Sequence, residues 1–309
     1  MKVVVAGGSG LLGRSICRGL LAAGHEPVVL TRDPTRAAAR LPGVRVAAWD
    51  PKVRGDWRTE LSGAGAVINL AGESIGRWPW TARRRGDLVE SRVGATRALV
   101  DAIASLEPGH RPAVLLNSSG TDLYEGRDAE PADETTPPAD TFLSRLVVAW
   151  EAEARKAEAL GVRVVLLRAS PVIAPGAAAL RLLALPVRLF VGGRLGSGRQ
   201  WASWVDIDDL VGLYMWALEK PEIVGPINAA APDVRTQAEF VKALGSALHR
   251  PIWFPTPAWV IRLVLGQQAT LALGSRRVWP ARALASGYVF KRPRLEDSVH
   301  HAFHGPRPA

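Results

Sequence analysis

The feature that most constrains this chain is a glycine-rich segment close to its N-terminus. The apolar, β-branched run Lys2–Ala6 predicts a buried parallel strand. The segment GGSGLLG follows directly at residues 7–13, and apolar residues then recur at helical spacing over 11–23 until Gly24 ends the pattern. A strand, a glycine turn and a helix in this order predict the first half of a βαβ unit.

The alternation of strand and helix continues through the first half of the chain. Further strands are expected at residues 26–31, 44–48, 66–70, 113–117 and 162–168, and helices at 83–104 and 144–160. This order predicts an α/β fold with a doubly wound parallel sheet, the Rossmann architecture, over residues 1–170. Residues 200–230 are expected to return to that domain. A smaller C-terminal α/β domain is expected over 171–299, with 300–309 as a frayed tail.

The glycine segment has the spacing of a phosphate-binding loop. It satisfies both G-x-x-G-x-x-G and G-x-G-x-x-G, in the strand-to-helix context that such loops require. Glycines permit a tight turn and close approach to a pyrophosphate, and the helix N-terminus offers free N–H groups. The alternative is a purely structural glycine turn. The residues expected to hold the diphosphate of a dinucleotide are Gly7, Ser9, Gly10, Leu11, Leu12 and Gly13.

The end of the second strand distinguishes between the two nicotinamide dinucleotides. NAD-selective sites place an acidic side chain there for the ribose 2′-hydroxyl, whereas this chain has Arg32, which could clamp a 2′-phosphate. The pattern therefore favours NADP(H), although Asp33 could still serve NAD and Arg32 could be a solvated strand end. Asp50, at the end of the third strand, is placed either to bind the adenine amino group or to form a turn before Pro51.

These residues, with the sequence NLAGE at 69–73, resemble the extended short-chain dehydrogenase/reductase superfamily. A subgroup labelled nucleoside-diphosphate-sugar epimerases, or cell-division-inhibitor-like proteins, is similar at SR (91–92), WE (150–151), GG (192–193), GSGRQW (196–201) and DDL (208–210). The resemblance implies a Rossmann core that binds NADP(H), with Leu70, Ala71 and Gly72 beside the cofactor. It also implies a C-terminal domain of unknown function over roughly 253–301. Homodimers are common in the superfamily, so the resemblance is compatible with a homodimer and leaves the oligomeric state open.

The catalytic positions of that superfamily are altered in this chain. Its members use a Tyr-x-x-x-Lys pair with a Ser or Thr, and the tyrosine exchanges a proton with the substrate oxygen. Aligned on that pattern, Thr141 stands in place of the tyrosine and Arg145 in place of the lysine. Arg145 keeps donors for the ribose hydroxyls of the cofactor. The Ser/Thr position falls on Gly120, between Ser119 and Thr121.

Other groups near the strand ends would then have to supply the proton. The candidates are Tyr124, Asp122 and Glu73, with Ser119 or Thr121 to polarise a carbonyl group. Each also has an ordinary structural interpretation: a packed aromatic ring for Tyr124, a surface turn for Asp122, and an acceptor for neighbouring backbone or Arg92 for Glu73.

A second loop could contact the substrate. Arg199 follows a Gly-Ser-Gly turn and is flanked by Trp201 and Trp204, a combination that suits an anionic or ring-bearing ligand. Arg199, Trp201 and Tyr124 are therefore the expected substrate contacts. The alternative is an arginine that stacks on its own tryptophan.

Composition excludes several classes of function. The formal net charge is +10, but the basic residues are spread along the chain without a nucleic-acid motif, so no nucleic-acid partner is expected. No apolar run is long enough to span a membrane and no signal peptide is recognisable, so we expect a cytoplasmic protein with no membrane partner. The single cysteine, Cys17, reads as a small core residue, and the histidines of the tail lack the partners of a metal site.

The sequence thus leads to one main hypothesis and one rival. The main hypothesis is an NADP(H)-dependent oxidoreductase or epimerase that acts on a small polar metabolite with atypical catalytic residues. The rival is a non-catalytic NADP(H)-binding protein that regulates or senses, and the changed residues at 120, 141 and 145 support it.

Overall fold

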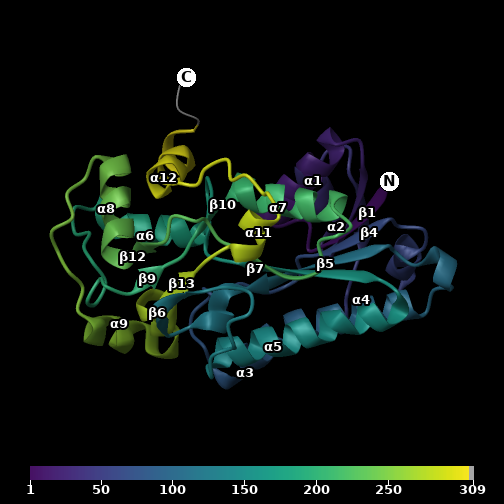
Figure 1. Ribbon diagram of the computed structural model, residues 1–309, viewed down its shortest axis with the longest axis horizontal. Coiled ribbons are helices and arrows are strands. Elements are labelled where there is room, and N and C mark those ends of the chain that lie inside the picture. The colour runs from purple at the N-terminus through teal and green to yellow at the C-terminus, as the bar shows by residue number, and fades with distance from the viewer. Residues whose placement is uncertain (306–309) are drawn as a thin grey trace.

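A seven-stranded parallel sheet forms the centre of the protein (Figure 1). The computed structural model describes residues 1–305, without the side chains of residues 127–129. The strand order is β11-β7-β5-β4-β1-β2-β3. The strands are β1 (Lys2–Ala6), β2 (Glu26–Thr31), β3 (Arg45–Ala48), β4 (Ala66–Asn69), β5 (Val114–Gly120), β7 (Arg163–Ala169) and β11 (Gly225–Ala229). The order reverses between β1 and β4, so the predicted doubly wound Rossmann architecture is confirmed.

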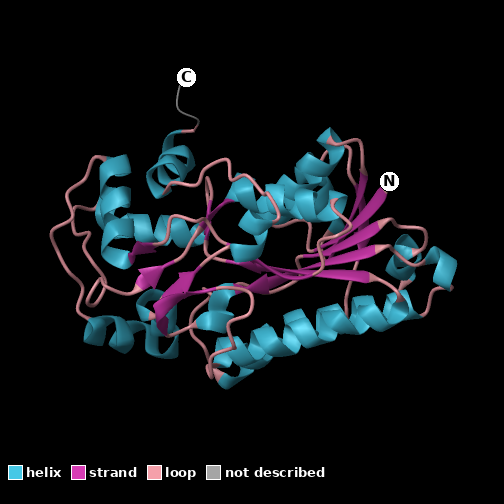
Figure 2. Ribbon diagram, viewed as in Figure 1, coloured by secondary structure: helices cyan, strands magenta, loops and turns pink. Residues whose placement is uncertain are grey.

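Helices cover both faces of this sheet (Figures 1 and 2). One face carries α1 (Leu11–Ala22), α2 (Pro34–Arg40), α7 (Ile207–Glu219) and α11 (Ala281–Ala285), and the other carries α4 (Ala95–Ala104) and α5 (Phe142–Arg155). Because both faces are buried, the strands are continuous apolar runs, and Val3, Val4 and Val5 are fully buried. Short 3₁₀ turns occur at Asp56–Leu61, Pro108–His110, Thr121–Tyr124, Lys156–Leu160 and Gly266–Ala269.

The helical region expected over 83–104 is not one regular α-helix. It consists of α3 (Ala82–Val89), a π-helical turn at Glu90–Gly94, and then α4. A π turn inserts an extra residue into the helix and is often found at functional sites. Here it re-aims the side chains of Ser91 and Arg92 toward the loop that follows β4.

A second lobe lies beside the C-terminal part of the sheet. A four-stranded sheet of order β12-β9-β13-β6 combines β12 (Arg235–Thr236), β9 (Trp201–Ala202), β13 (Arg276–Val278) and β6 (Arg127–Ala132). The short strands β8 (Val172–Ile173) and β10 (Val205–Asp206) pair with each other. The lobe's helices are α6 (Ala178–Arg188), α8 (Gln237–Leu248), α9 (Ala258–Leu265), α10 (Thr270–Leu273) and α12 (Leu295–His304). Strand β6 comes from the stretch assigned to the first domain, so the lobe is not continuous in sequence.

The end of the chain differs from the expected frayed tail. Helix α12 continues to His304, and its residues Val299 and Ala302 are buried against the lobe. Residues 300–304 are therefore part of the fold, while 306–309 lie outside the described residues. Within residues 1–305, no helix is long and apolar enough to cross a membrane, and no group of His, Cys, Asp and Glu side chains is placed to hold a metal ion.

Candidate cofactor cleft and active site

A cleft opens at the carboxyl ends of β1, β2 and β4. Its volume is about 360 Å³, and it lies where the strand order reverses, the usual ligand position in an open α/β sheet. The expected cofactor residues that line it are Gly7, Ser9, Gly10, Arg32, Asp50, Leu70, Ala71 and Gly72. Leu11, Leu12, Gly13 and Arg145 are not among the lining residues.

The glycines of the loop have different tasks. Gly7 has φ +75°, and a Cβ atom there would lie 3.0 Å from the backbone of Leu70 and Ala71. A Cβ atom on Gly13 would lie 2.5 Å from Gly8, so these two glycines allow helix α1 to approach the strand. At Gly10 the nearest atom would be 3.6 Å away, because that position faces the open cleft.

The start of α1 is prepared for an anion. Its N-cap residue is Gly10, no side chain caps the helix there, and the first turn carries no acidic residue. The first-turn amides of an α-helix have no intrahelical acceptor, so those of Leu11, Leu12 and Gly13 remain for a ligand. The side chain of Leu12 packs against the core, so Leu12 could serve a ligand through its backbone only.

The far end of the cleft is basic. Arg32 follows β2 with a largely exposed side chain, 3.9 Å from the Glu73 carboxylate, and Lys52 lines the same cleft. The Asp33 carboxylate accepts a hydrogen bond from the backbone N–H of Arg36 at 3.0 Å, which caps α2. Asp33 is thus engaged in capping. The Asp50 carboxylate accepts from the Lys52 N–H at 2.9 Å, as expected of a turn, and it also lines the cleft, so its contact with adenine stays a prediction.

The loop after β4 is held from behind by a buried amide network. Asn69 donates to the Thr96 hydroxyl at 2.8 Å and to the Asn117 side-chain oxygen at 2.7 Å. Its own side-chain oxygen accepts from the Ala71 N–H at 3.1 Å. This network fixes the backbone of Leu70, Ala71 and Gly72 against the cleft.

Glu73 is engaged in ion pairs rather than free for proton transfer. Its carboxylate pairs with the nearly buried Arg84 and lies near Arg32. Its backbone N–H donates to Ser91 at 3.1 Å, and its carbonyl oxygen accepts from Arg92 at 2.8 Å. The prediction that Glu73 is a catalytic acid is corrected accordingly: it orders the cleft wall.

Tyr124 also has a different role from the predicted one. Its side chain is fully buried, its hydroxyl accepts from Arg168 at 2.5 Å, and it donates to the Asn228 side-chain oxygen at 3.0 Å. Burial raises the pKa of Tyr124 to about 12, although the neighbouring Arg168 lowers it. A buried phenol with both hydrogen-bonding roles filled has no contact for substrate, so Tyr124 is neither the proton donor nor a substrate contact.

The two hydroxyls expected to polarise a carbonyl group are buried as well. Ser119 donates to Glu151 at 2.6 Å, and Glu151 forms a bidentate ion pair with Arg168 at 2.8 Å. Thr121 is 3.2 Å from the Ser170 hydroxyl. Both hydroxyls therefore belong to the internal polar network at the ends of β5 and β7, where no ligand is needed to satisfy them.

Thr141 and Arg145, the positions aligned with the catalytic pair, have structural contacts at the start of helix α5. The side chain of Thr141 accepts from the Ser144 N–H at 3.2 Å and caps α5. Arg145 has an exposed side chain that pairs with Asp140. Arg145 is thus not brought to the cofactor cleft, and the prediction that it binds the cofactor is corrected.

A charged cluster that sequence reasoning missed lies next to these positions. Arg276, on β13, has a nearly buried guanidinium 2.9 Å from Asp122 and 3.8 Å from Glu125. The Nη2 atom of Arg276 is the one that faces both carboxylates, and its Nε atom makes no hydrogen bond to the side chains that the structure describes. Glu125 also accepts from the hydroxyl of Thr270, and Thr141 is among the neighbours that lower the pKa of its carboxyl group. Burial raises the pKa of the Glu125 carboxyl, although Arg276 lowers it.

This cluster is adjacent to the cofactor cleft. A Cβ atom on Gly72, which lines the cleft, would lie 3.2 Å from the Arg92 guanidinium. Burial lowers the pKa of Arg92 to about 10, although the charge of Asp122 raises it. The charges therefore run from the cleft through Arg92 and Asp122 to Arg276 and Glu125. The only local signal in the sequence was the closeness of Glu125 to the already considered Tyr124.

The arginine and tryptophans of the second predicted loop have separate contacts. Arg199 is exposed, whereas the ring of Trp201 is stacked by Arg277, whose guanidinium lies 4.5 Å from the ring centroid. Trp204 is fully buried and donates to the backbone oxygen of Asp233. Arg199 thus does not stack on Trp201, and its contact with a ligand stays a prediction.

Comparison with known proteins adds an independent observation. Residues 3–230 match the model of the NAD dependent epimerase/dehydratase family, and residues 256–302 match a domain of unknown function. The chain is 37% identical to the mouse epimerase family protein SDR39U1, over 97% of this chain and 98% of that one. It is 34% identical to a chloroplastic homolog from Arabidopsis thaliana, over 97% of this chain and 86% of that one. The crystal structure of human SDR39U1 with NADPH superposes with a TM-score of 0.86 at 33% identity, covering 98% of this chain and 99% of that one.

Proposed function

This chain belongs to the NAD dependent epimerase/dehydratase family, and from that premise we propose that it is an NADP(H)-dependent oxidoreductase or epimerase acting on a small polar metabolite. The observation that carries the choice of cofactor is the end of β2. Arg32 faces the cleft, while Asp33, the acid that could have served NAD, is bound to the first turn of α2. The relative crystallised with NADPH supports the same choice.

The residues of the cleft fit such a cofactor. Gly7, Gly10 and the uncapped first turn of α1 would hold the diphosphate, and Arg32 with Lys52 would hold the 2′-phosphate. Asp50 would face the adenine. When bound, the cofactor supplies a hydride donor or acceptor to the substrate carbon.

The chain itself must then exchange a proton with the substrate oxygen. Tyr124 is buried and Glu73 pairs with Arg84, so the candidates become the carboxyl groups of Asp122 and Glu125, both of which lie near Arg276. We infer that Glu125 exchanges the proton, because Thr141, the residue aligned with the missing tyrosine, is among the neighbours that influence the pKa of its carboxyl group. Its raised pKa keeps the protonated form available at higher pH than in an exposed carboxyl group.

The cofactor assignment is tested by tryptophan fluorescence quenching on titration with NADPH and with NADH. We expect tighter binding of NADPH, and we expect Arg32→Ala to weaken NADPH by roughly 10- to 100-fold with little change for NADH, since it removes a charge-assisted contact. Arg40→Ala, an exposed arginine at the far end of α2, is the matched control. Equal affinities for both cofactors in the wild type would refute the assignment.

The chemistry is tested by following NADPH absorbance against a library of carbonyl compounds. Once a substrate is found, Glu125→Gln should lower turnover by about 100-fold or more while NADPH affinity is retained. Unchanged turnover in that variant would reject Glu125 as the proton donor and leave Asp122→Asn as the next variant to examine.

The non-catalytic alternative has one specific observation in its favour. The positions of the family's tyrosine and lysine are occupied by a helix-capping threonine and an exposed arginine. A protein that binds NADPH tightly but turns over no member of the library would support this alternative and overturn the proposed chemistry.

A further inference from the structure

The acidic residues of this chain are distributed unevenly. No Asp or Glu occurs between Glu158 and Asp206, and none occurs between Glu239 and Glu296. The two stretches meet in the C-terminal lobe, where the carbonyl oxygen of Gly192 accepts from the N–H groups of Trp253 and Phe254. The surface formed by these stretches therefore carries basic side chains with few acidic neighbours.

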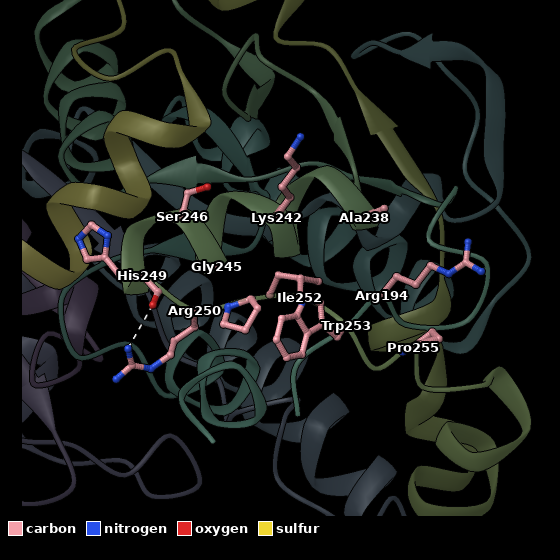
Figure 3. Close-up of a pocket in the computed structure, with 12 residues that line it drawn as sticks. Arg194, Ala238, Lys242, Gly245, Ser246, His249, Arg250, Ile252, Trp253 and Pro255 are labelled. Carbon is pink, nitrogen blue, oxygen red and sulfur yellow. Dashed lines mark hydrogen bonds between the residues drawn. The ribbon is translucent and has the colours of Figure 1, made fainter. Parts of the chain in front are cut away.

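A groove of about 840 Å³ lies on this surface, between helix α8 and the segment that follows it (Figure 3). Arg194, Lys242, His249 and Arg250 line it, and no acidic residue does. Trp253 lies near the middle of the view, with Arg194 on one side of it and His249 and Arg250 on the other. The acid on α8, Glu239, is bound to Thr236 in the capping box at the start of that helix.

Exposed apolar side chains accompany the groove. We call them the apolar strip: Phe190, Val191, Trp253 and Phe254, together with Trp259 and Leu263 on helix α9, which follows in the chain. The guanidinium of Arg250 lies 4.5 Å from the Phe190 ring centroid, which joins the strip to the groove. Trp253 is 72% exposed and Leu263 is 78% exposed, values that a monomer's core packing does not explain.

We propose that this face of the C-terminal lobe docks on the surface of a bilayer that contains anionic phospholipids. Tryptophan and phenylalanine side chains partition to the headgroup level of a bilayer, and basic side chains are attracted to anionic lipids. The apolar strip would enter the interface while Arg194 and Lys242 face the headgroups. Since no described helix can span a bilayer, the contact concerns its surface alone, and to that extent it revises the expectation of no membrane partner.

Two other occupants fit the observations less well. A second copy of the chain would bring the same basic groups face to face, which is unfavourable. A single-stranded nucleic acid would stack on the aromatic rings, but it would leave aliphatic side chains such as Leu263 and Val264 in water. The bilayer is the occupant that uses the aliphatic, the aromatic and the basic groups together.

The inference goes beyond the proposed function and can fail separately from it. In Figure 1, α8 and α9 lie at the end of the molecule opposite the N-terminus. No residue that lines the groove also lines the cofactor cleft. Variants on this lobe should therefore leave NADPH binding unchanged. NADPH quenching serves as the fold and cofactor control for every variant.

The test is co-sedimentation of the full chain with vesicles of phosphatidylcholine alone and with vesicles of an equal mixture of phosphatidylcholine and phosphatidylglycerol. We expect binding to the mixed vesicles that weakens with salt. Trp253→Ser with Leu263→Ser should lower the partition coefficient about tenfold or more, and Arg194→Glu with Lys242→Glu should lower it roughly tenfold or more. Val289→Ser, also highly exposed, and Arg18→Glu with Arg40→Glu, with the same change of net charge, are the matched controls.

Four outcomes would overturn the inference. The first is no binding to the mixed vesicles, and the second is an equal loss of vesicle binding in the charge-matched controls. The third is salt-dependent binding of an oligothymidylate that the Trp253→Ser and Leu263→Ser changes abolish. The fourth is a dimer, seen by light scattering, that the same changes dissociate. Loss of vesicle binding confined to the lobe variants, with NADPH quenching intact, would support it.

Discussion

Replacing Tyr124 by phenylalanine separates a structural role of this residue from a catalytic one. The change removes a hydroxyl group that is fully buried and keeps the ring. It removes two hydrogen bonds: the one that the Arg168 guanidinium donates to the Tyr124 hydroxyl, and the one that this hydroxyl donates to the Asn228 side-chain oxygen. The guanidinium keeps its bidentate pair with Glu151 and one contact of 3.3 Å to the backbone oxygen of Glu134.

The expected loss follows from these unsatisfied groups. Leaving buried polar partners without a hydrogen bond destabilises a protein by about 1–3 kcal/mol, and the charged partner places this case toward the upper end. For a chain of this size the melting temperature should fall by roughly 2–8 °C. Tyr214→Phe is the matched control, because its buried hydroxyl is 2.6 Å from the neutral Ser118 hydroxyl. That variant should lose about 0.5–1.5 kcal/mol.

The measurement is thermal unfolding followed by circular dichroism, with NADPH quenching recorded for each variant. We expect Tyr124→Phe to melt lower than Tyr214→Phe and both to bind NADPH as the wild type does. If Tyr124→Phe melted like the wild type and yet abolished turnover, Tyr124 would be a catalytic residue after all. The burial argument would then be wrong.

Three further predictions test the rest of the fold. Gly13→Ala should destabilise the protein by about 1–3 kcal/mol and abolish NADPH quenching, because its Cβ atom would lie 2.5 Å from the loop backbone. Gly10→Ala should leave the melting temperature unchanged and lower the affinity for NADPH only. Glu151→Gln should cost about 3–5 kcal/mol in urea unfolding by leaving Arg168 buried and unpaired, and changing both residues to methionine should recover most of this loss. Burial raises the pKa of Cys17 from 9.0 to about 12, so above about pH 9 the native state holds a proton that the unfolded state releases. The free energy of unfolding should therefore fall as the pH rises above about 9, and it should fall less steeply in Cys17→Ala.

The sheet and the glycine loop could be predicted from sequence because their signals are local. A β-branched run such as 3–5 is buried on both faces wherever it packs in a parallel sheet, and the glycines that follow it act within a few residues of one another. The π turn at Glu90–Gly94 could not be predicted. It adds one residue to a helix whose hydrophobic spacing stays almost unchanged.

The catalytic candidates were harder because their partners are remote in the chain. Tyr124 and Glu125 are neighbours in sequence, yet Tyr124 contacts Arg168 and Asn228, whereas Glu125 contacts Arg276 and Thr270. Neither set of contacts can be predicted from composition or from the spacing of residues in the sequence. For the same reason, the sequence leaves Asp33 available to NAD, whereas the structure shows that its carboxylate caps α2.

The polar network around Tyr124 also joins the two lobes. Asn228, on the last strand of the Rossmann sheet, donates to the backbone oxygen of Trp279 at 3.0 Å, and Glu134 accepts from the N–H of Arg282. Arg276 lies on β13, which enters the same region. The C-terminal segment therefore closes the end of the sheet beside which the proposed proton donor lies. Removing that segment would expose Tyr124 and Arg168 to water and remove the ionic partner of Glu125, so chemistry at this site requires the last quarter of the chain even though the glycine loop lies in the first.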